Sequence, residues 1–405
     1  MQCYRDHVRK TDLNIAPFTE LRENGAYYVD KTLLIRDILE DNSHGVYMFI
    51  RPPGFGKTVN ISMLDAFFNR EYQGNTWFEG LGISDCPEYA YYKNAFPVIR
   101  LNLKDAGTAS YESYIDGVRK AVRNAYRPHR HILERSDLDA VVRRNFESLD
   151  RMDIDEDSLS SSIKNLSGAI TEIIGTKPVI LIDDYDTPAI YSYGKGIHKD
   201  VLRFLNCFLE TSLKTNEDRQ MAFLTGNMRI AGSSISSCLD NVTVNNVFSK
   251  RADDKFGFTE SEVEMILNDF GLLDRISEAR DWYGGYHLGN IDAYAPYGIM
   301  NYLKGENRPR PYRTDSRIDE IVGELLKNLD EETCADVLRL IAGGSIVTEL
   351  TDRLPCEEPP ISGETFYSLL TVSGYLRVIP LDEDDFTLSL PNRTIKDVLE
   401  RMARE

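Results

Sequence analysis

One junction limits the fold of this chain more than any other. An apolar run, Val46 to Ile50, passes directly into the loop Arg51-Pro52-Pro53-Gly54-Phe55-Gly56-Lys57-Thr58. An amphipathic segment follows, with apolar side chains at helical spacing at Ile61, Leu64 and Phe68. A strand, a tight turn and a helix in this order are typical of α/β proteins with a parallel sheet.

The turn between this strand and helix has the chemistry of a phosphate-binding loop. Backbone amides and a helix N-terminus attract phosphate, Lys57 supplies a cation, and the Thr58 hydroxyl is suited to ligate Mg²⁺. We expect the nucleotide to be bound by residues 53–59: Pro53, Gly54, Phe55, Gly56, Lys57, Thr58 and Val59. The usual pattern has Gly where Arg51 stands. The alternative is a Pro/Gly turn with Thr58 as a helix cap, which leaves Lys57 unexplained.

A second apolar run, Val179 to Ile182, ends in Asp183 and Asp184. A buried strand with acids at its C-terminal edge delivers them to the side of an α/β sheet where ligands bind. We expect Asp183 to hold Mg²⁺ and Asp184 to orient the attacking water. Related ATPases more often place the longer Glu there, and retraction by about 1.5 Å can slow a step by about 10²-fold. The alternative is that both acids solvate a strand end, while Asp186 or Thr187 caps a helix with Pro188 in its first turn.

A third apolar run, Met221 to Leu224, leads into Thr225, Gly226 and Asn227. Polar groups at the end of a strand beside the other two could sense the third phosphate, with Asn227 as a catalytic candidate. Arg229 could neutralise charge in the transition state. Turn chemistry explains Gly226-Asn227 equally well.

The wider pattern predicts an α/β chain in three parts. Five short apolar runs, the three above with Pro97 to Leu103 and Val242 to Val247, predict a mostly parallel five-stranded sheet. A capping box at Thr259 to Glu262 starts a mainly helical stretch. The last sixty residues, a helix and then a hairpin, resemble a winged-helix module, although any small α+β cap would give a similar pattern. The expected parts are a P-loop core (1–258), a helical lid (259–345) and a winged-helix-like module (346–405).

Charge and composition restrict the partners. The net charge is −18, which disfavours non-specific binding to nucleic acid. A basic stretch around Arg119 to His131 could bind it locally, and a solvated helix face is the alternative. Six scattered cysteines without a CxxC pair, and the absence of a long apolar run, predict reduced thiols and a soluble cytoplasmic protein without membrane contact.

Taken together, these patches resemble the AAA-ATPase-like family that often precedes a PD-(D/E)XK nuclease-like domain. The resemblance covers nearly the whole chain. It includes residues 28–35, Arg51-Pro52 with Phe55 to Thr58, Leu181 to Asp183 with Tyr185-Asp186 and Pro188, Leu224 to Gly226, Phe256 to Thr259 with Glu262-Val263, Trp282-Tyr283 with Gly285-Tyr286, Ser373 to Leu376, and Pro391-Asn392. Two departures are Pro53-Gly54 in place of a basic pair and Asp184 in place of Glu. The chain ends about where the nuclease-like domain would begin, so no residues are assigned to nuclease chemistry.

The resemblance implies a P-loop core of the additional-strand type, with one strand between the nucleotide strand and the Asp183 strand. It also implies ATP and Mg²⁺ as ligands, and it places Asp30-Lys31-Thr32 near the base or ribose, unless these residues only cap a helix. We expect a slow Mg-dependent ATPase with a regulatory or motor-like role, acting with a protein partner or as a homo-oligomer. The alternatives are a nucleotide switch with negligible hydrolysis, a small-molecule kinase, and a nucleic-acid-processing ATPase acting with a nuclease in trans.

Overall fold

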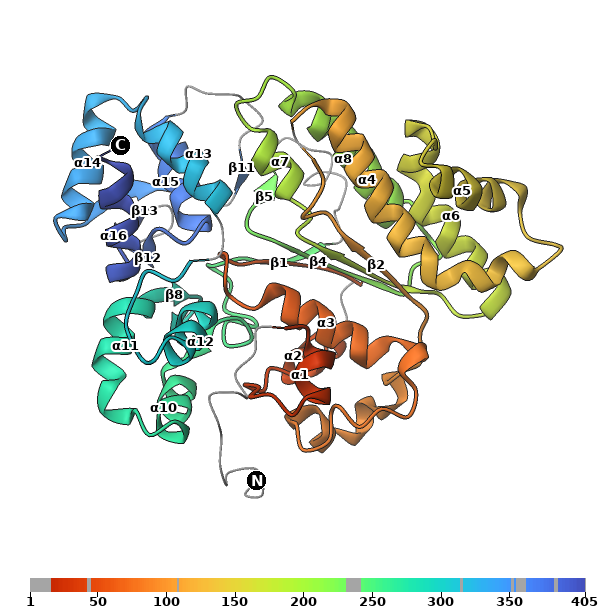
Figure 1. Cartoon of the computed structure of the whole chain (residues 1–405), viewed down its shortest axis with the longest axis horizontal. Coiled ribbons are helices and arrows are strands. Elements are labelled where there is room, and N and C mark those ends of the chain that lie inside the picture. Colours follow the sequence, from red (N-terminus) through yellow and green to blue (C-terminus); the bar gives the residue numbers. More distant parts are fainter. Residues whose placement is uncertain are drawn as a thin grey trace.

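A parallel five-stranded sheet forms the centre of the molecule (Figure 1). The computed structural model describes residues 16–41, 45–107, 109–230, 242–313, 316–350, 353–354, 362–381 and 385–404. The sheet has the order β2-β3-β4-β1-β6, and every neighbouring pair is parallel. Its strands lie where the apolar runs predict them: β1 Val46–Ile50, β2 Val98–Asn102, β3 Val179–Asp183, β4 Met221–Gly226 and β6 Val242–Asn245.

Strand β4 lies between β1 and β3, as the additional-strand fold requires. Its register pairs Ile50 with Gly226 and Ile182 with Leu224, so the three strands end at one edge. The loop that follows β1, the acids that end and follow β3 and the polar turn after β4 therefore start from neighbouring positions. This arrangement confirms the predicted five-stranded α/β core.

Each face of the sheet buries alternate side chains under helices. Tyr47 and Phe49 of β1 pack in a cluster with α1 (Phe18–Glu23), α2 (Leu33–Leu39) and α3 (Lys57–Phe68). Met48 of the same strand faces the opposite cluster, which includes side chains of these helices: α4 (Tyr111–Tyr126), α5 (Ala140–Arg151), α6 (Glu156–Ile174), α7 (Thr187–Ser192) and α8 (His198–Leu209). Three layers result, with α5 and α6 extending furthest from the sheet (Figure 1).

The segment after the core starts at the predicted capping box. The Glu262 amide donates to Thr259 Oγ1 (3.3 Å), and the Thr259 amide donates to Glu262 Oε2 (2.8 Å). The helices are α10 (Glu260–Asp269), α11 (Ile276–Tyr283) and α12 (Pro296–Lys304). A hairpin interrupts them: β8 (Tyr286–Leu288) and β9 (Ile291–Tyr294) form a three-stranded sheet with β7 (Phe258–Thr259). The aromatic stretch that suggested a packed corner supplies this hairpin, so the lid is not helical throughout.

The C-terminal elements surround a second antiparallel sheet of order β10-β13-β12. The predicted helix and hairpin are present as α15 (Gly363–Val372), β12 (Arg377–Pro380) and β13 (Asp385–Ser389), and the winged-helix assignment stays a prediction. The remaining elements are α13 (Ser316–Leu326), α14 (Glu331–Ile341), β10 (Ile346–Glu349), β11 (Arg353–Leu354) and α16 (Arg393–Met402). Strand β11 pairs in parallel with β5 (Arg229–Ile230) of the core.

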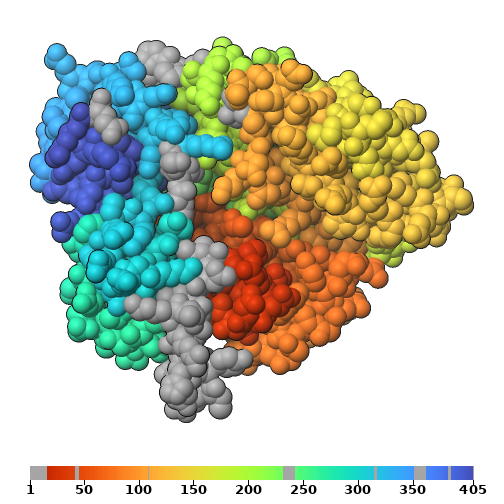
Figure 2. Space-filling model, viewed as in Figure 1, coloured from red at the N-terminus to blue at the C-terminus, as the bar shows by residue number. Residues whose placement is uncertain are grey.

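Sequence patches far apart in the chain meet where the lid contacts the C-terminal elements. Asn392 Nδ2 donates to the Gly284 carbonyl (2.7 Å), and Thr394 Oγ1 donates to the Trp282 carbonyl (2.6 Å). These contacts join the Trp-Tyr-Gly-Gly stretch to the start of α16. The two regions form one side of the molecule, next to the core (Figure 2).

Candidate nucleotide site

The loop between β1 and α3 is held by contacts with the lid. Gly54 and Gly56 have positive φ values of 82° and 85°, and α3 begins directly afterwards at Lys57. The Tyr297 amide donates to the Gly54 carbonyl (3.2 Å), and the Gly257 amide donates to the Phe55 carbonyl (3.2 Å). Tyr297 belongs to the lid and Gly257 to the last residues of the core before it, so the loop is tied to the lid and to the segment that leads into it.

Arg51, which replaces the usual first glycine, has a structural role. Its guanidinium is buried and donates to the carbonyls of Ile50 (2.8 Å), Asn245 (2.9 Å), Asn246 (2.9 Å) and Ala252 (3.3 Å). Burial lowers the pKa of Arg51 to about 10. The side chain thus joins the end of β1 to the segment after β6, and it points into the protein rather than toward a phosphate.

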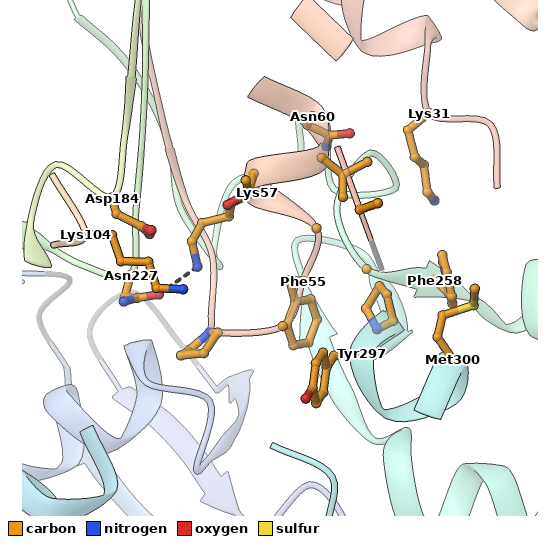
Figure 3. A pocket seen from close by; sticks show the side chains of 18 of the residues that line it. Lys31, Phe55, Lys57, Asn60, Lys104, Asp184, Asn227, Phe258, Tyr297 and Met300 are labelled. Atoms are coloured by element: carbon orange, nitrogen blue, oxygen red, sulfur yellow. Dashed lines mark hydrogen bonds between the residues drawn. The ribbon is translucent and has the colours of Figure 1, made fainter. Parts of the chain in front are cut away.

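Lys57 reaches across the start of α3 to the end of β4. Its ammonium donates to the carbonyls of Arg51 (2.8 Å) and Pro52 (3.1 Å) and to Asn227 Oδ1 (2.6 Å), as Figure 3 shows for the last. An ammonium has three protons, and these three acceptors match them. A phosphate that binds Lys57 must therefore replace at least one of these contacts.

The two acids that follow the Val179–Ile182 run have different environments. Asp183 is fully buried; Thr225 Oγ1 donates to its Oδ1 (2.5 Å) and Asn102 Nδ2 to its Oδ2 (3.3 Å). Asp184 instead lines the cavity beside the loop, and its backbone has a positive φ of 54°. Asp tolerates this left-handed conformation better than most residues, and such strain gathers at functional sites.

Main-chain hydrogen bonds on both sides fix the exit of Asp184 from β3. The Leu103 amide donates to the Asp183 carbonyl (3.1 Å), and the Tyr185 amide donates to the Thr225 carbonyl (3.0 Å). The main-chain hydrogen bonds between β3 and its neighbours β2 and β4 therefore continue beyond the end of β3. Asp184 lies between the two residues held by these bonds, and its backbone is therefore fixed at the edge of the sheet.

Asp186 has a role that the sequence analysis missed. It is the residue before α7, but its carboxylate makes no capping bond; Oδ2 accepts instead from the amides of Asn227 and Met228, both at 2.7 Å. A Cβ on Gly226 would lie 2.7 Å from Asp186 Oδ1, so only glycine allows this approach. The predicted cap by Asp186 is therefore wrong, because the turn after β4 binds its carboxylate; Pro188 does lie in the first turn of α7.

Asp186 is fully buried, and its electrostatics follow from that burial. Desolvation, with a further contribution from Asp184, raises its pKa to about 7, although the Met228 and Asn227 amides and Lys57 act in the opposite direction. Asp186 holds the turn whose next side chain, Asn227, accepts from Lys57. The available signal was its position directly before Thr187-Pro188, and that position suggested a cap.

A cavity of about 570 Å³ brings most of the predicted residues together. Residues 53–59 line it together with Asp184 and Asn227. Thr225 is used internally by Asp183. Arg229, in β5, does not line the cavity in the part of the chain that the structure describes. Asp183, which we expected to hold Mg²⁺, is fully buried and is not among the residues that line the cavity.

The two ends of the cavity differ in character. Asp184, Lys104 and Asn227 lie on one side of the loop, and Lys31, Phe258 and Met300 lie on the other (Figure 3). The first end carries charged and polar groups, and the second is mostly apolar and aromatic. Lys31, at the second end, donates to Glu262 Oε1 (2.6 Å) and to the Asp254 carbonyl (2.7 Å), and burial lowers its pKa. Lys31 thereby ties the N-terminal segment to the lid.

Several lining residues had no motif of their own in the sequence. Lys104 lies two residues after β2. Its place just beyond the C-terminal end of a predicted strand could have identified it as a candidate for the site. Lys255, Tyr297 and Arg317 come from segments after the core strands, and only folding brings them to the cavity. Asp30 does not line it; its carboxylate accepts from the Thr32 and Gly82 amides, at 2.8 and 2.6 Å.

The donor set suits a hard divalent cation that shares its ligands with phosphate. Among the described residues, no group of three or more His, Cys, Asp or Glu side chains is placed to hold a metal alone. Thr58 is exposed at the start of α3, and Asp184 faces the same cavity. Mg²⁺ usually takes one or two protein oxygens and completes its shell with phosphate and water, so these residues fit it.

Part of the basic stretch is paired or buried. Arg119 pairs with Asp116 (2.8 Å) and Arg130 with Asp150 (2.8 Å). His129 is buried against the Val98 carbonyl (3.1 Å) and has a pKa lowered to about 4 by that burial. These contacts account for Arg119, His129 and Arg130 without a nucleic-acid partner, whereas Lys120 and Arg127 are exposed, so binding of nucleic acid here stays a prediction. Within the described ranges, no helix combines the length and apolar character that crossing a bilayer requires.

Comparison with known proteins identifies the family to which this chain belongs. The model of the family described as Predicted AAA-ATPase matches residues 12–236. A search of curated proteins finds no match. Among solved structures, a signal transduction ATPase with numerous domains and a tetratricopeptide repeat sensor, from Pyrococcus horikoshii, is 11% identical with a TM-score of 0.31, covering 92% of this chain and 42% of its own. Cdc6p from Pyrobaculum aerophilum is 12% identical with a TM-score of 0.30, covering 92% of each chain. This chain thus spans less than half of the first structure, and likeness of this degree carries no functional argument.

Proposed function

This chain belongs to the predicted AAA-ATPase family, and we propose that it binds MgATP in the cavity beside the β1–α3 loop and hydrolyses it slowly. One observation carries the proposal: the loop after β1, the acid after β3 and the amide side chain after β4 line a single cavity. Ligands of α/β proteins bind at this edge of the sheet.

Phosphate binding would use Lys57, whose ammonium is hydrogen-bonded within the protein in this structure. The amides that open α3 face the phosphates, and Lys57 exchanges a loop carbonyl for a phosphate oxygen. The exchange replaces a neutral carbonyl acceptor by an anionic phosphate oxygen, which attracts the ammonium charge more strongly. Asn227 remains beside the ammonium, because Asp186 holds its backbone amide. The apolar end near Phe258 and Met300 takes the nucleoside.

Magnesium would be held by the Thr58 hydroxyl and the Asp184 carboxylate, which line the cavity, while the buried Asp183 would act on it from a distance. The ion neutralises charge on the phosphates when it is bound. Asp183 keeps one orientation, since Thr225 and Asn102 both donate to it. Its contribution is therefore a fixed carboxylate behind the site.

Hydrolysis would rely on Asp184 to orient water against the third phosphate. The Asp184 carboxylate faces the cavity from a constrained backbone, which keeps its position defined. It is one methylene shorter than Glu, and a misplacement of about 1 Å can cost roughly 10² in rate. Slow turnover follows. A nucleotide switch with negligible hydrolysis is the second candidate, and the short carboxylate is the observation that favours it.

A regulatory role follows from the contacts between loop and lid. The Gly54 carbonyl accepts from Tyr297 of the lid, and the Phe55 carbonyl accepts from Gly257 just before the lid, so a change in loop shape would reach the lid through these two bonds. We assign the lid to reporting nucleotide state to a protein partner or to further copies of the chain.

Phosphate release from MgATP tests the proposal. The native chain should release phosphate faster than buffer, Asp184→Asn should bind ATP but lose turnover by at least about tenfold, and Asp184→Glu should reveal whether reach limits the rate. Release at the buffer rate with tight binding would favour the switch. Turnover unchanged in Asp184→Asn would remove Asp184 from the reaction.

A further inference from the structure

In the part of the chain that the structure describes, four lysines line the nucleotide cavity, and three of them are bound to protein acceptors. The Lys57 ammonium meets three acceptors, as described above. Lys31 donates to both oxygens of Glu262, at 2.6 and 2.7 Å, and to the Asp254 carbonyl at 2.7 Å. Lys255 pairs with the Asp254 carboxylate (2.7 Å). These three charges are used within the protein.

Lys104 is the fourth of these lysines, and its ammonium has a different environment. The side chain is exposed, and within the described ranges the ammonium takes part in no hydrogen bond and no ion pair. It belongs to the polar end of the cavity, on the same side of the loop as Asp184 and Asn227 (Figure 3). Among the described lysines of the cavity, Lys104 is therefore the one whose charge is available to a ligand.

The sheet places the backbone of Lys104 next to the acids of β3. The Leu103 amide donates to the Asp183 carbonyl (3.1 Å), so the residues after them leave two neighbouring strands at one point. These residues are Lys104 and Asp184. The Lys104 amide donates to Asn102 Oδ1 (2.8 Å), and Asn102 Nδ2 donates to Asp183 Oδ2 (3.3 Å). The Asn102 side chain thus joins the turn after β2 to the acid that ends β3.

Helix α4 holds the other side of this turn. Ala106 is buried, and its amide donates to the Leu103 carbonyl (3.1 Å). A Cβ on Gly117 of α4 would lie 2.6 Å from Ala106 Cα, so the helix approaches the turn as closely as a glycine allows. The backbone of Lys104 is fixed between β3 and α4, and only its flexible stem carries the charge into the cavity.

A chain of phosphates in this cavity would end near Lys104 and Asp184. In the proposed binding mode the nucleoside lies at the end with Phe258 and Met300, and the loop with Lys57 separates that end from the polar one (Figure 3). The transferring phosphoryl group therefore meets two side chains of opposite charge. A carboxylate suits the attacking water, and an ammonium suits the phosphoryl oxygens.

The reaction itself calls for a cation at this place. The water oxygen forms a bond to the third phosphorus, and the bond from that phosphorus to the bridging oxygen breaks. The electron pair of the broken bond stays with ADP; one water proton remains on the released phosphate and the other passes to solvent. Negative charge is spread over the phosphoryl and leaving oxygens in the transition state, and a positive group placed there lowers the barrier.

A lysine can supply this charge. Its ammonium is compact and sits on a flexible four-carbon stem, so it can follow the phosphoryl group as the bond breaks. Its hydrogen bonds to phosphate oxygens are charge-assisted on both sides. Lys57 is held at the loop by its own carbonyls and by Asn227. A second cation that has no protein acceptor can therefore act where Lys57 does not reach.

We propose that Lys104 is a catalytic residue of this site and supplies, from the same chain, the positive charge that stabilises the transition state of hydrolysis. The inference rests on the proposed function, because it needs ATP in this cavity. It assigns three tasks to one chain: Lys57 binds phosphate at the loop, Asp184 orients water, and Lys104 offsets charge on the transferring group. A second copy of the chain is not required for the chemical step.

Phosphate release and nucleotide binding by Lys104→Ala test this proposal in the full chain. We expect kcat to fall by about 10²-fold, as loss of one transition-state donor does, and the Kd of MgADP to change by less than about twofold. Lys104→Arg should retain part of the rate. Lys164→Ala is the matched control, since Lys164 is exposed on α6 and is not among the cavity residues. Unchanged turnover in Lys104→Ala overturns the proposal.

A second readout needs no turnover. ADP with Mg²⁺ and aluminium fluoride presents a planar mimic of the transferring phosphoryl group, and Lys104→Ala should bind this mixture at least about tenfold more weakly than the native chain does. Added methylammonium should restore part of the turnover of Lys104→Ala and none of that of Asp184→Asn. Equal affinity of the native chain and Lys104→Ala for the mimic overturns the proposal.

Mixed chains test whether the cation acts within one chain. Asp184→Asn chains, which retain Lys104, should not restore turnover when they are mixed with Lys104→Ala chains. Restored turnover would show that a second copy supplies the cation, and it would overturn the proposal.

Lys57→Ala and the mimic separate a failure of this inference from a failure of the proposed function. Loss of nucleotide binding in Lys57→Ala, with unchanged turnover in Lys104→Ala, would reject the role of Lys104 alone. Phosphate release at the buffer rate by the native chain would reject hydrolysis, and the role of Lys104 in it, whatever the affinity for the mimic. Undiminished nucleotide binding in Lys57→Ala would reject the site itself.

Discussion

Replacement of Asp186 by Asn should alter how the stability of the protein depends on pH. Burial raises the pKa of this carboxyl from 3.8 to about 7. An acid whose pKa is higher in the folded state binds its proton more tightly there, so ionisation favours unfolding. The penalty is absent below the unfolded pKa, grows as pH rises between 3.8 and about 7, and is complete above the folded value.

The magnitude follows from linkage. At pH 5 the penalty from Asp186 is about 1.5–2 kcal/mol, and at pH 8 it is about 4 kcal/mol. An asparagine oxygen can still accept from the Asn227 and Met228 amides and carries no charge. Whatever constant cost the new amide group adds, the stability of Asp186→Asn relative to the native chain should rise by roughly 2–3 kcal/mol between pH 5 and pH 8.

Urea unfolding at both pH values measures this difference, with free energies obtained from midpoints and a common slope. Asp274→Asn, which removes an exposed carboxyl in the lid, is the control and should show no such change. A relative stability that stays constant, or that falls as pH rises, would refute the reasoning that Asp186 is buried and raised in pKa.

Two further substitutions test contacts that organise the site. Arg51→Lys should lower stability by about 2–4 kcal/mol, because an ammonium cannot serve all the buried carbonyls that the guanidinium binds; thermal unfolding without nucleotide measures it, and a change under 0.5 kcal/mol would contradict it. Gly285→Ala should cost at least about 1–3 kcal/mol, since Gly285 has a φ of 79° and a Cβ would lie 1.9 Å from the Pro391 carbonyl oxygen. Gly323→Ala, where a Cβ meets nothing within 4 Å, is its control and should be neutral or stabilising.

The sequence predicted the core well because its signals are local. Short apolar runs ending in polar residues located all five strands of the central sheet, and the loop before α3 follows from Gly-Lys-Thr at a strand end. The capping box at Thr259 is equally local. The hairpin β8–β9 was missed because its strands are three and four residues long and rich in aromatics that suited a packed corner.

The site was predicted only where a motif marks it. Lys57 and Asn227 are neighbours because β4 lies beside β1 in the sheet. The family resemblance predicted that strand order. Arg317 and Tyr297 reach the cavity through packing between regions, and no spacing in the chain records that packing. Arg229 was predicted from the same strand end as Asn227. It lies outside the cavity because the chain has left β4 and entered β5 at this residue.

The division of the chain at residues 258 and 345 stays a prediction. Buried residues of α13 and α14 share a cluster with those of α15 and α16, while the lid helices α10 to α12 form a cluster of their own. This packing favours grouping α13 and α14 with the C-terminal elements. Independent expression of the lid and the C-terminal region would locate the boundary.

Binding of MgATP by the native chain and by Lys57→Ala, measured as the shift in unfolding temperature at saturating nucleotide, tests the central claim most directly. A ligand present at 100 times its Kd stabilises the folded state by about 2.7 kcal/mol, so the native chain should show a clear upward shift. The account predicts that Lys57→Ala loses this shift, measured in each protein against its own unfolding temperature without nucleotide. An equal shift in both proteins would contradict it.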